Sequence, residues 1–344
     1  SGNANYGMVA AISGTLISVK DIDGGDGHAL YVNGQIANTE GAVPRITLDG
    51  ATLLSSGNGM YLAGYTETVI RNSTITSDGE GGTGIEIRAG KLTISNSSIT
   101  GGSGEYEGAP NGNGSTSQNV ALAVAQHTTE LPLEVTVESG TLTGGAAFVQ
   151  ANPQGNGAEA VEKVQIEILG GTFDGQVYSE NKEGFISGGT YSEALESAYV
   201  FPGLTTQEDA DGNTVIKKLE TVYLDGAKGD DANSGADASQ AVKSLDTAVR
   251  LVAGDGVIYI CGQVNVGASM ALSGVTIRRA EGYFNQLISV NGSDVELTLS
   301  DVTIDGNNVT GVSSDGYLVF VSGGATLNIE DGARLIHNQT AAVY

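Results

Sequence analysis

One short phrase recurs along this chain and restricts the folds that are open to it. It reads apolar, any residue, apolar, any residue, then a turn residue (Gly, Asn, Asp or Ser), and a final apolar residue closes it. The apolar residue before the turn falls at positions 48, 70, 94, 137, 168 and 186 in the first half and at 299 and 329 in the second. Internal similarity of this kind is the signature of a repeat architecture. Clear copies are Ile46-Thr-Leu-Asp-Gly-Ala-Thr-Leu53, Leu92-Thr-Ile-Ser-Asn-Ser-Ser-Ile99, Val135-Thr-Val-Glu-Ser-Gly-Thr-Leu142 and Leu297-Thr-Leu-Ser-Asp-Val-Thr-Ile304.

Each phrase contains short alternating strands joined by a tight turn, and a further alternating strand lies between phrases, as at Ala29–Val32, Met60–Leu62 and Val120–Val124. Alternate side chains on a strand point to opposite faces, so each strand hides one apolar row. Gly, Asn and Asp accept the positive φ that such turns require. If every circuit repeats this pattern, the apolar rows stack and equivalent strands pair in parallel. The sequence therefore predicts an all-β parallel β-helix, or β-solenoid; an antiparallel sandwich would explain the short strands but not the repeated phrase.

Two consecutive solenoid units are predicted, residues 1–219 and 220–344. The first ends in a hairpin with its turn at Asp211-Gly-Asn213, which would cover an exposed sheet edge. We expect the second to be cut at residue 344, as its next strand begins.

A single convincing helix is predicted at the start of the second unit. Asp237 and Gln240 suit its N-terminal cap, and Gly254 suits its end. The residues that would form its apolar face are Val242, Leu245, Val249 and Val252. We expect this helix to cap the open end of the second stack.

Two segments resemble known families. The run Tyr223-Leu-Asp, Asp230-Asp-Ala-Asn-Ser-Gly235, Ala241-Val-Lys-Ser-Leu-Asp-Thr-Ala248 and Gly254-Asp-Gly-Val-Ile-Tyr259 resembles the N-terminal entry of pectate-lyase-like right-handed β-helices. The segment from Ile186-Ser-Gly-Gly-Thr-Tyr191 to Asp211-Gly-Asn-Thr-Val215 resembles an ending common in large surface proteins of gut Firmicutes. The resemblance implies a right-handed helix and a bacterial surface or secreted location. It does not fix a function, because this fold serves enzymes, phage tailspikes and adhesin stalks.

Net charge narrows the range of partners. The chain has 40 acidic and 15 Lys and Arg residues, a formal charge of −25, which would repel nucleic acid and anionic lipid alike. No stretch approaches the roughly 20 apolar residues of a membrane span, so no membrane insertion is expected. The single cysteine excludes a disulfide within the chain. We expect a monomer.

Two segments outside the repeat are the best candidates for binding. Residues 103–118 and 150–159 account for the two longest steps between phrases, so they must loop out of the stack. Solenoids commonly place binding on such loops, although mobile loops without function would look the same. The candidate binding residues are Glu105, Tyr106, Glu107, Asn111, Asn113, Asn152, Gln154 and Asn156.

Sites for ions and for catalysis are sparse. The loop that carries Asp225, Asp230, Asp231 and Asp237 is dense enough in carboxylates for a structural calcium ion. No cofactor is expected otherwise, and no Asp-x-Asp pair lies on a repeat strand, where two carboxylates would share a face. Arg278 and Arg279 could meet an acidic sugar, but adjacent strand residues point to opposite faces, so at most one of them would serve a given site.

These patterns favour a non-catalytic adhesin or stalk segment of a bacterial surface protein. Its lateral faces and loops would bind host glycans or glycoproteins, such as mucin or secreted immunoglobulin. The rival hypothesis, based on the fold resemblance, is a polysaccharide lyase or glycoside hydrolase that acts on an acidic polysaccharide.

Overall fold

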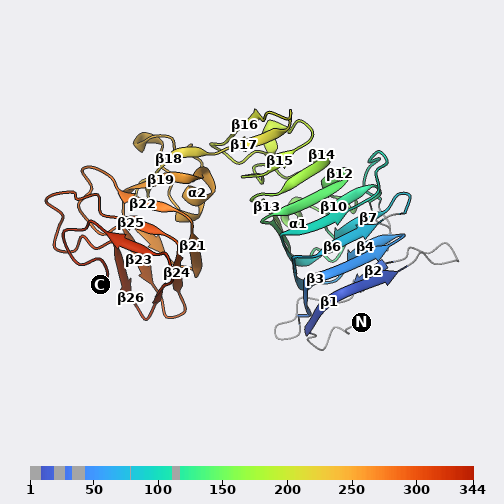
Figure 1. The fold of residues 1–344 in the computed structure, drawn as a ribbon, viewed down its shortest axis with the longest axis horizontal. Helices are drawn as coiled ribbons and strands as arrows, with labels where there is room; N and C mark the ends of the chain where they lie inside the picture. Colours follow the sequence, from blue (N-terminus) through green and yellow to red (C-terminus); the bar gives the residue numbers. More distant parts are fainter. Residues whose placement is uncertain (1–8, 19–27, 33–42, 78, 111–116) are drawn as a thin grey trace. The chain divides into compact units, whose positions relative to one another are not determined.

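A computed structural model describes residues 9–18, 28–32, 43–77, 79–110 and 117–344. The chain divides into two compact units (Figure 1). The first comprises Ser1–Phe201 with Thr206–Ile216, and the second comprises Pro202–Thr205 with Lys217–Tyr344. Both units are all-β, and their sheets are built mainly of parallel strands.

The first column of strands in the first unit follows the repeated phrase. It contains β1 (Val9–Ser18), β3 (Arg45–Ser55), β5 (Thr66–Arg71), β8 (Gly90–Ser95), β11 (Leu133–Val137) and β13 (Val164–Ile168). Each strand pairs in parallel with the next. The residues before the turn are direct partners along this column, in the order Leu48, Ile70, Ile94, Val137, Ile168 and Ile186. The predicted register of the repeat is therefore confirmed.

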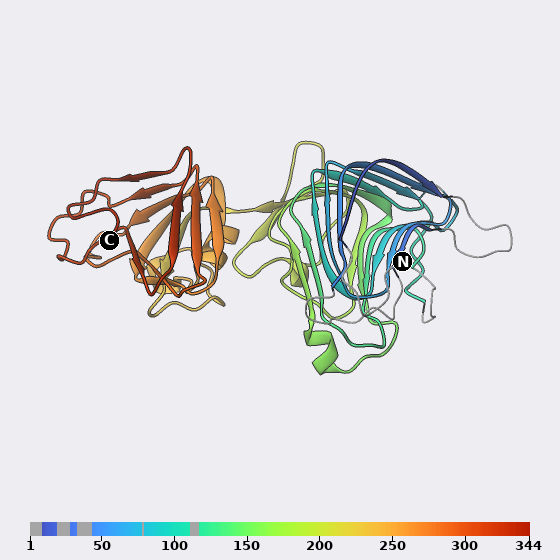
Figure 2. The same ribbon diagram turned by 90° about the horizontal axis from the view of Figure 1, so that it is seen from below.

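Two further parallel columns complete each circuit. The second column contains the later parts of β1 and β3, then β6 (Thr74–Ser77), β9 (Ser97–Thr100), the first part of β12 (Gly140–Ala151), the start of β14 (Thr172–Ser179) and β15 (Thr190–Tyr191). The third column contains β2 (His28–Val32), β4 (Asn58–Leu62), β7 (Thr83–Ile87), β10 (Val120–Ala125) and the later parts of β12 and β14. Figure 2 looks along this stack, and strands of successive circuits lie behind one another.

The core of the first unit lies between the columns, where each circuit contributes the same positions. Leu48, Leu53 and Met60 of one circuit are fully buried, and Ile70, Ile75 and Ile85 repeat them in the next. Burying one such side chain contributes roughly 1.5–3 kcal/mol, so stacked circuits stabilise one another through neighbouring rows. The architecture is consistent with a β-solenoid.

The turn between the first and second columns uses the residues that the phrase predicts. Gly50, Asn72 and Asn96 have φ values of 67°, 52° and 45°. Their side chains also connect the circuits: Asn96 Nδ2 donates to Asn72 Oδ1 (2.8 Å), and Asn72 Nδ2 donates to Asp49 Oδ1 (2.9 Å).

The first unit ends in short elements. After α1 (Ala158–Glu162), β14 and β15 come η1 (Ser197–Tyr199), β16 (Thr205–Glu208) and β17 (Thr214–Lys217). Strand β17 pairs antiparallel with β15. The predicted turn at 211–213 follows β16, and Asp209 Oδ1 accepts hydrogen bonds from the N–H groups of Asp211 and Asn213.

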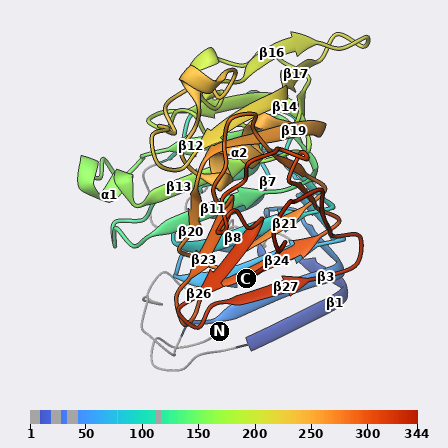
Figure 3. The ribbon, with the colours of Figure 1, turned by 90° about the vertical axis from the view of Figure 1, so that its left-hand side faces the viewer.

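The second unit repeats the parallel pairing. One column contains β18 (Leu219–Asp225), β19 (Val252–Gly262), β22 (Thr276–Arg279), β25 (Thr303–Asp305) and β28 (Arg334–Ile336). The others contain β20 (Val264–Val266), β23 (Ile288–Asn291) and β26 (Val319–Ser322), and β21 (Met270–Ser273), β24 (Glu296–Ser300) and β27 (Thr326–Ile329). The strands of the second and third of these columns are labelled in Figure 3.

The predicted helix is present but its limits were wrong. Asp237 caps a short 3-10 turn, η2 (Ala238–Gln240), and α2 begins only at Leu245, with Ser244 as its cap, and ends at Leu251. Val242 forms a parallel bridge with Leu224 instead. Val252 starts β19, which continues through Gly254. The residues at both ends of the apolar pattern therefore take part in strand pairing and not in the helix. That α2 caps the second stack stays a prediction.

Among the described residues, none of the helices has the length and apolar character needed to cross a lipid bilayer.

Candidate functional site

The middle strands of the third column of the first unit are buried on both sides. Every residue of β4, β7 and β10 is buried, whereas β5 and β11 alternate between buried and more exposed positions. A second apolar cluster lies outside the core, formed by Val120, Ala123, Ala146, Val149 and Ala151. The loop between β9 and β10, residues 101–119, supplies Tyr106 and Ala109 to this cluster. We call residues 101–119 the excursion; its described parts fold back over β10 and β12.

A buried ion pair anchors the returning end of the excursion. Ile85 and Ile87 of β7 face the core, so Glu86 between them faces outward, under the excursion. Glu86 Oε1 accepts a hydrogen bond from Arg88 Nε (2.6 Å), and Glu86 Oε2 accepts one from the Ser117 N–H (2.6 Å). Both charged side chains have no exposed area, and the Arg88 guanidinium lies 5.7 Å from the ring centroid of Tyr61. Burial raises the pKa of Glu86, whereas Arg88 and the Ser117 N–H lower it.

Backbone hydrogen bonds and close backbone contacts hold the end of the excursion that leaves β9. Gly102 donates to Gly82 O (2.8 Å) and accepts from Gly145 N (2.9 Å). A Cβ built on Gly145 would lie 1.7 Å from Gly104 O, so only glycine fits here. The excursion therefore has a fixed course over β12 at this end.

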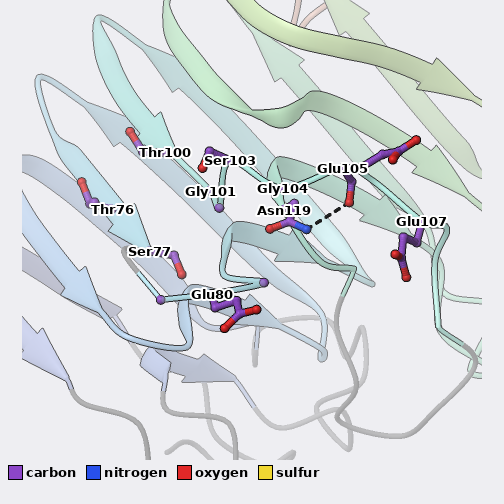
Figure 4. Close-up of a pocket in the computed structure, with 13 residues that line it drawn as sticks. Thr76, Ser77, Glu80, Thr100, Gly101, Ser103, Gly104, Glu105, Glu107 and Asn119 are labelled. Atoms are coloured by element: carbon purple, nitrogen blue, oxygen red, sulfur yellow. Dashed lines mark hydrogen bonds between the residues drawn. The ribbon is translucent and has the colours of Figure 1, made fainter.

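The first of two hollows lies beside the excursion (Figure 4). It has a volume of about 770 Å³, and its lining is polar and rich in glycine. Glu80 comes from the turn before β7, and Glu105 and Glu107 come from the excursion. Asn119 Nδ2 donates to Glu105 O (3.0 Å), which ties the two ends of the excursion together.

The second hollow, of about 340 Å³, has aromatic walls. Tyr106 of the excursion and Tyr178 of β14 line it, with ring centroids 6.1 Å apart. Glu107, Gln176 and Glu180 add polar groups to the lining. Burial, with smaller contributions from Tyr178 and Glu180, raises the pKa of Tyr106 to about 12, so its hydroxyl stays protonated and can donate a hydrogen bond at neutral pH.

The predicted loop residues divide into four groups. Glu105, Tyr106 and Glu107 line the hollows. Asn152 and Asn156 instead hydrogen-bond to each other, and Asn156 Nδ2 also donates to Gln126 Oε1 and His127 O. The Asn152 N–H donates to Glu180 Oε2 (2.6 Å), so Asn152 holds in place a residue that lines the second hollow. Gln154 is half-buried and lines neither hollow. Asn111 and Asn113 lie outside the described residues.

Sequence reasoning missed the wall that β14 provides. Tyr178 pairs with Val149 one circuit earlier, which places it at the outer position of the third column. Tyr178 follows five residues after Phe173, the last apolar residue of the repeated phrase. That spacing could have placed Tyr178 on the third column, but only if the register of the column were already known.

The four aspartates proposed for calcium serve the backbone. Their carboxylates accept hydrogen bonds from nearby backbone N–H groups: Asp225 from Ala227 and Lys228, Asp230 from Ala232, Asp231 from Lys243 and Ser244, and Asp237 from Ser239 and Gln240. Within the described ranges, no three His, Cys, Asp or Glu residues form a group that could hold a metal ion. Calcium binding stays a prediction.

The second unit contains one convergent ionisable cluster that the sequence did not reveal. On the column of β18 and β19, Tyr259, Arg278 and Asp305 are successive cross-strand partners. Asp305 accepts from Arg278 Nε (3.2 Å) and lies 3.1 Å from His337 Nδ1. Burial alone would raise the pKa of Asp305, but the Asn307 N–H, His337 and Arg278 together hold it below its ordinary value. Arg279, as expected for a neighbour, points away and is buried.

This cluster has one carboxylate, and that carboxylate is already paired. Glycoside hydrolysis uses two carboxyl groups, roughly 5–9.5 Å apart across the sugar. The hollows beside the excursion contain an aromatic pair and several carboxylates. No protein-family model matches the chain, and no curated protein matches it.

Proposed function

We propose that this chain is a non-catalytic segment of a bacterial surface adhesin or stalk, folded as a right-handed parallel β-helix, that binds host glycans or glycoproteins on the excursion face of its first unit. The proposal places the chain outside the cell, as the resemblance to surface proteins implies. Glycans on mucin or on secreted immunoglobulin are the expected ligands.

The second hollow is the observation that carries the proposal. Sugar rings present one apolar face and a rim of hydroxyl groups. The rings of Tyr106 and Tyr178 supply an apolar surface, and Gln176, Glu107 and Glu180 supply hydrogen-bonding groups beside it. Concave sites lined by aromatic side chains with a few polar groups are the usual form of small-ligand sites.

Screening the purified chain against mucin and a panel of neutral, basic and acidic oligosaccharides tests the proposal. We expect Tyr106→Ala and Tyr178→Ala each to weaken binding about tenfold, because each removes an aromatic wall worth roughly 1–1.5 kcal/mol.

The matched control is Tyr223→Ala. Tyr223 is half-buried in the second unit and stacks on Tyr259 with centroids 5.7 Å apart, so this change also removes one ring of a tyrosine pair. Binding that falls equally in all three variants, or no binding to any glycan of the panel, would contradict the proposal.

A further inference from the structure

The two hollows share a carboxylate and contain no opposing charge. Glu107 lines both, Glu80 and Glu105 line the first, and Glu180 lines the second. No Lys, Arg or His is present among the described residues that line either hollow. The carboxylates of Glu80, Glu105 and Glu107 make no ion pair or hydrogen bond with any described residue. They are therefore available to a ligand.

Three cations of the first unit form ion pairs on a different column, and Arg88 is paired with Glu86 under the excursion. Arg45 pairs with Glu67 at 2.8 Å, Arg71 with Asp49 at 3.0 Å and Lys91 with Glu134 at 2.7 Å. These residues all belong to β3, β5, β8 and β11 of the first column. Glu67, Asp49 and Glu134 are neutralised there, whereas the glutamates that line the hollows form no ion pair with a described residue. Clefts lined by charges of one sign concentrate ligands of the opposite sign.

Backbone pairing argues against an extended peptide as the ligand. A peptide that adds as a strand needs an exposed sheet edge. Strand β10 is paired with β7 on one side and β12 on the other, and β12 is paired with β10 and β14. The surface beside the hollows therefore offers side chains and not an open edge, and the tyrosine pair suits rings.

We propose that the hollows bind an oligosaccharide of amino sugars with free amino groups, its rings against Tyr106 and Tyr178 and an ammonium group beside Glu107. This inference rests on the proposed function and narrows its ligand. The position of Glu107 in both hollows means that a ligand several rings long can use both. Uronic and sialic acids are disfavoured, because their carboxylates would meet carboxylates.

Calorimetric titration of the whole chain with four probes tests this inference. The probes are the tetramers of glucosamine, N-acetylglucosamine and galacturonic acid, and tetralysine. The titrations are run at about pH 6, so that the free amino groups of the glucosamine tetramer carry protons. We expect the glucosamine tetramer to bind about tenfold more tightly than its acetylated form, with an affinity that falls as salt is added.

Glu107→Gln tests the role of the negative charge, because glutamine has nearly the same size and shape as glutamate but is neutral. It should weaken binding of the glucosamine tetramer about three- to tenfold and weaken binding of the acetylated tetramer by less, because that ligand carries no charge. The control is Glu193→Gln, which alters an exposed glutamate of the first unit that lines neither hollow; it should change neither affinity.

The possible failures are distinguishable. Galacturonic acid binding as tightly as glucosamine, or equal binding of the acetylated tetramer, would overturn the charge preference and leave glycan binding intact. Tetralysine binding as tightly as the glucosamine tetramer would overturn the assignment to a sugar. If none of the sugars binds, and Tyr106→Ala has no effect across the wider panel, the proposed function fails as well.

Discussion

Asparagine has two tasks at the turn between the first two columns. Asn96 adopts a φ of 45°, which few residues accept, and its side chain donates to Asn72 of the preceding circuit. The sequence predicts the first task, since Asn stands at the turn of the repeated phrase. It could not predict the second, because the hydrogen bond joins residues 24 positions apart that only the register brings together.

We predict that Asn96→Ala lowers the free energy of unfolding by about 2 kcal/mol. About 1–2 kcal/mol comes from a side chain in the left-handed region and about 1 kcal/mol from the lost hydrogen bond. Asn96→Gly should cost only about 1 kcal/mol, because glycine accepts the backbone conformation. Urea unfolding of both variants measures this. Equal losses for alanine and glycine would show that the backbone conformation contributes nothing.

At the scale of elements, the excursion depends on the buried pair of Glu86 and Arg88. Sequence reasoning identified the excursion from the long step in the repeat, and found Tyr106 and its two flanking glutamates. It did not find the anchor, because Glu86 lies in an ordinary alternating strand and looks like a surface residue. Only the folded excursion makes that outer position an interior one.

We predict that Glu86→Gln destabilises the first unit by about 3–5 kcal/mol and loosens the excursion. The change removes the buried carboxylate that is hydrogen-bonded to the buried Arg88 guanidinium. Glu67→Gln is the control, because it breaks the exposed pair with Arg45, where a loss below about 1 kcal/mol is expected. Urea unfolding, with amide exchange across residues 101–110, compares the two. An equal, small effect of both changes would mean that the pair does not hold the excursion.

The helix of the second unit illustrates a different limit of sequence reasoning. An apolar period of three to four residues was present over 242–252, but Val242 and Val252 are used by strand pairing. Local periodicity cannot distinguish a helix face from residues that a neighbouring strand needs, so the helix was predicted too long.

At the scale of the whole molecule, the repeat gave the parallel columns and their register, because stacking like residues repeats the same burial in each circuit. The position of the candidate site could not be predicted from the repeat alone. The candidate site combines the excursion with β14, elements about 70 residues apart in sequence, and the second hollow exists only where these elements meet. Charge composition excluded nucleic acid as an expected partner, but it could not show that no Lys, Arg or His is among the described residues that line the hollows.

Hydrogen exchange of the whole chain, with and without the tightest-binding oligosaccharide of the panel, tests most directly whether the excursion face is the binding site. The account predicts slower exchange within residues 101–110 and 176–180, and no change in the strands of the second unit. Binding that slows exchange only in the second unit, or that leaves residues 101–110 unaffected, would contradict it.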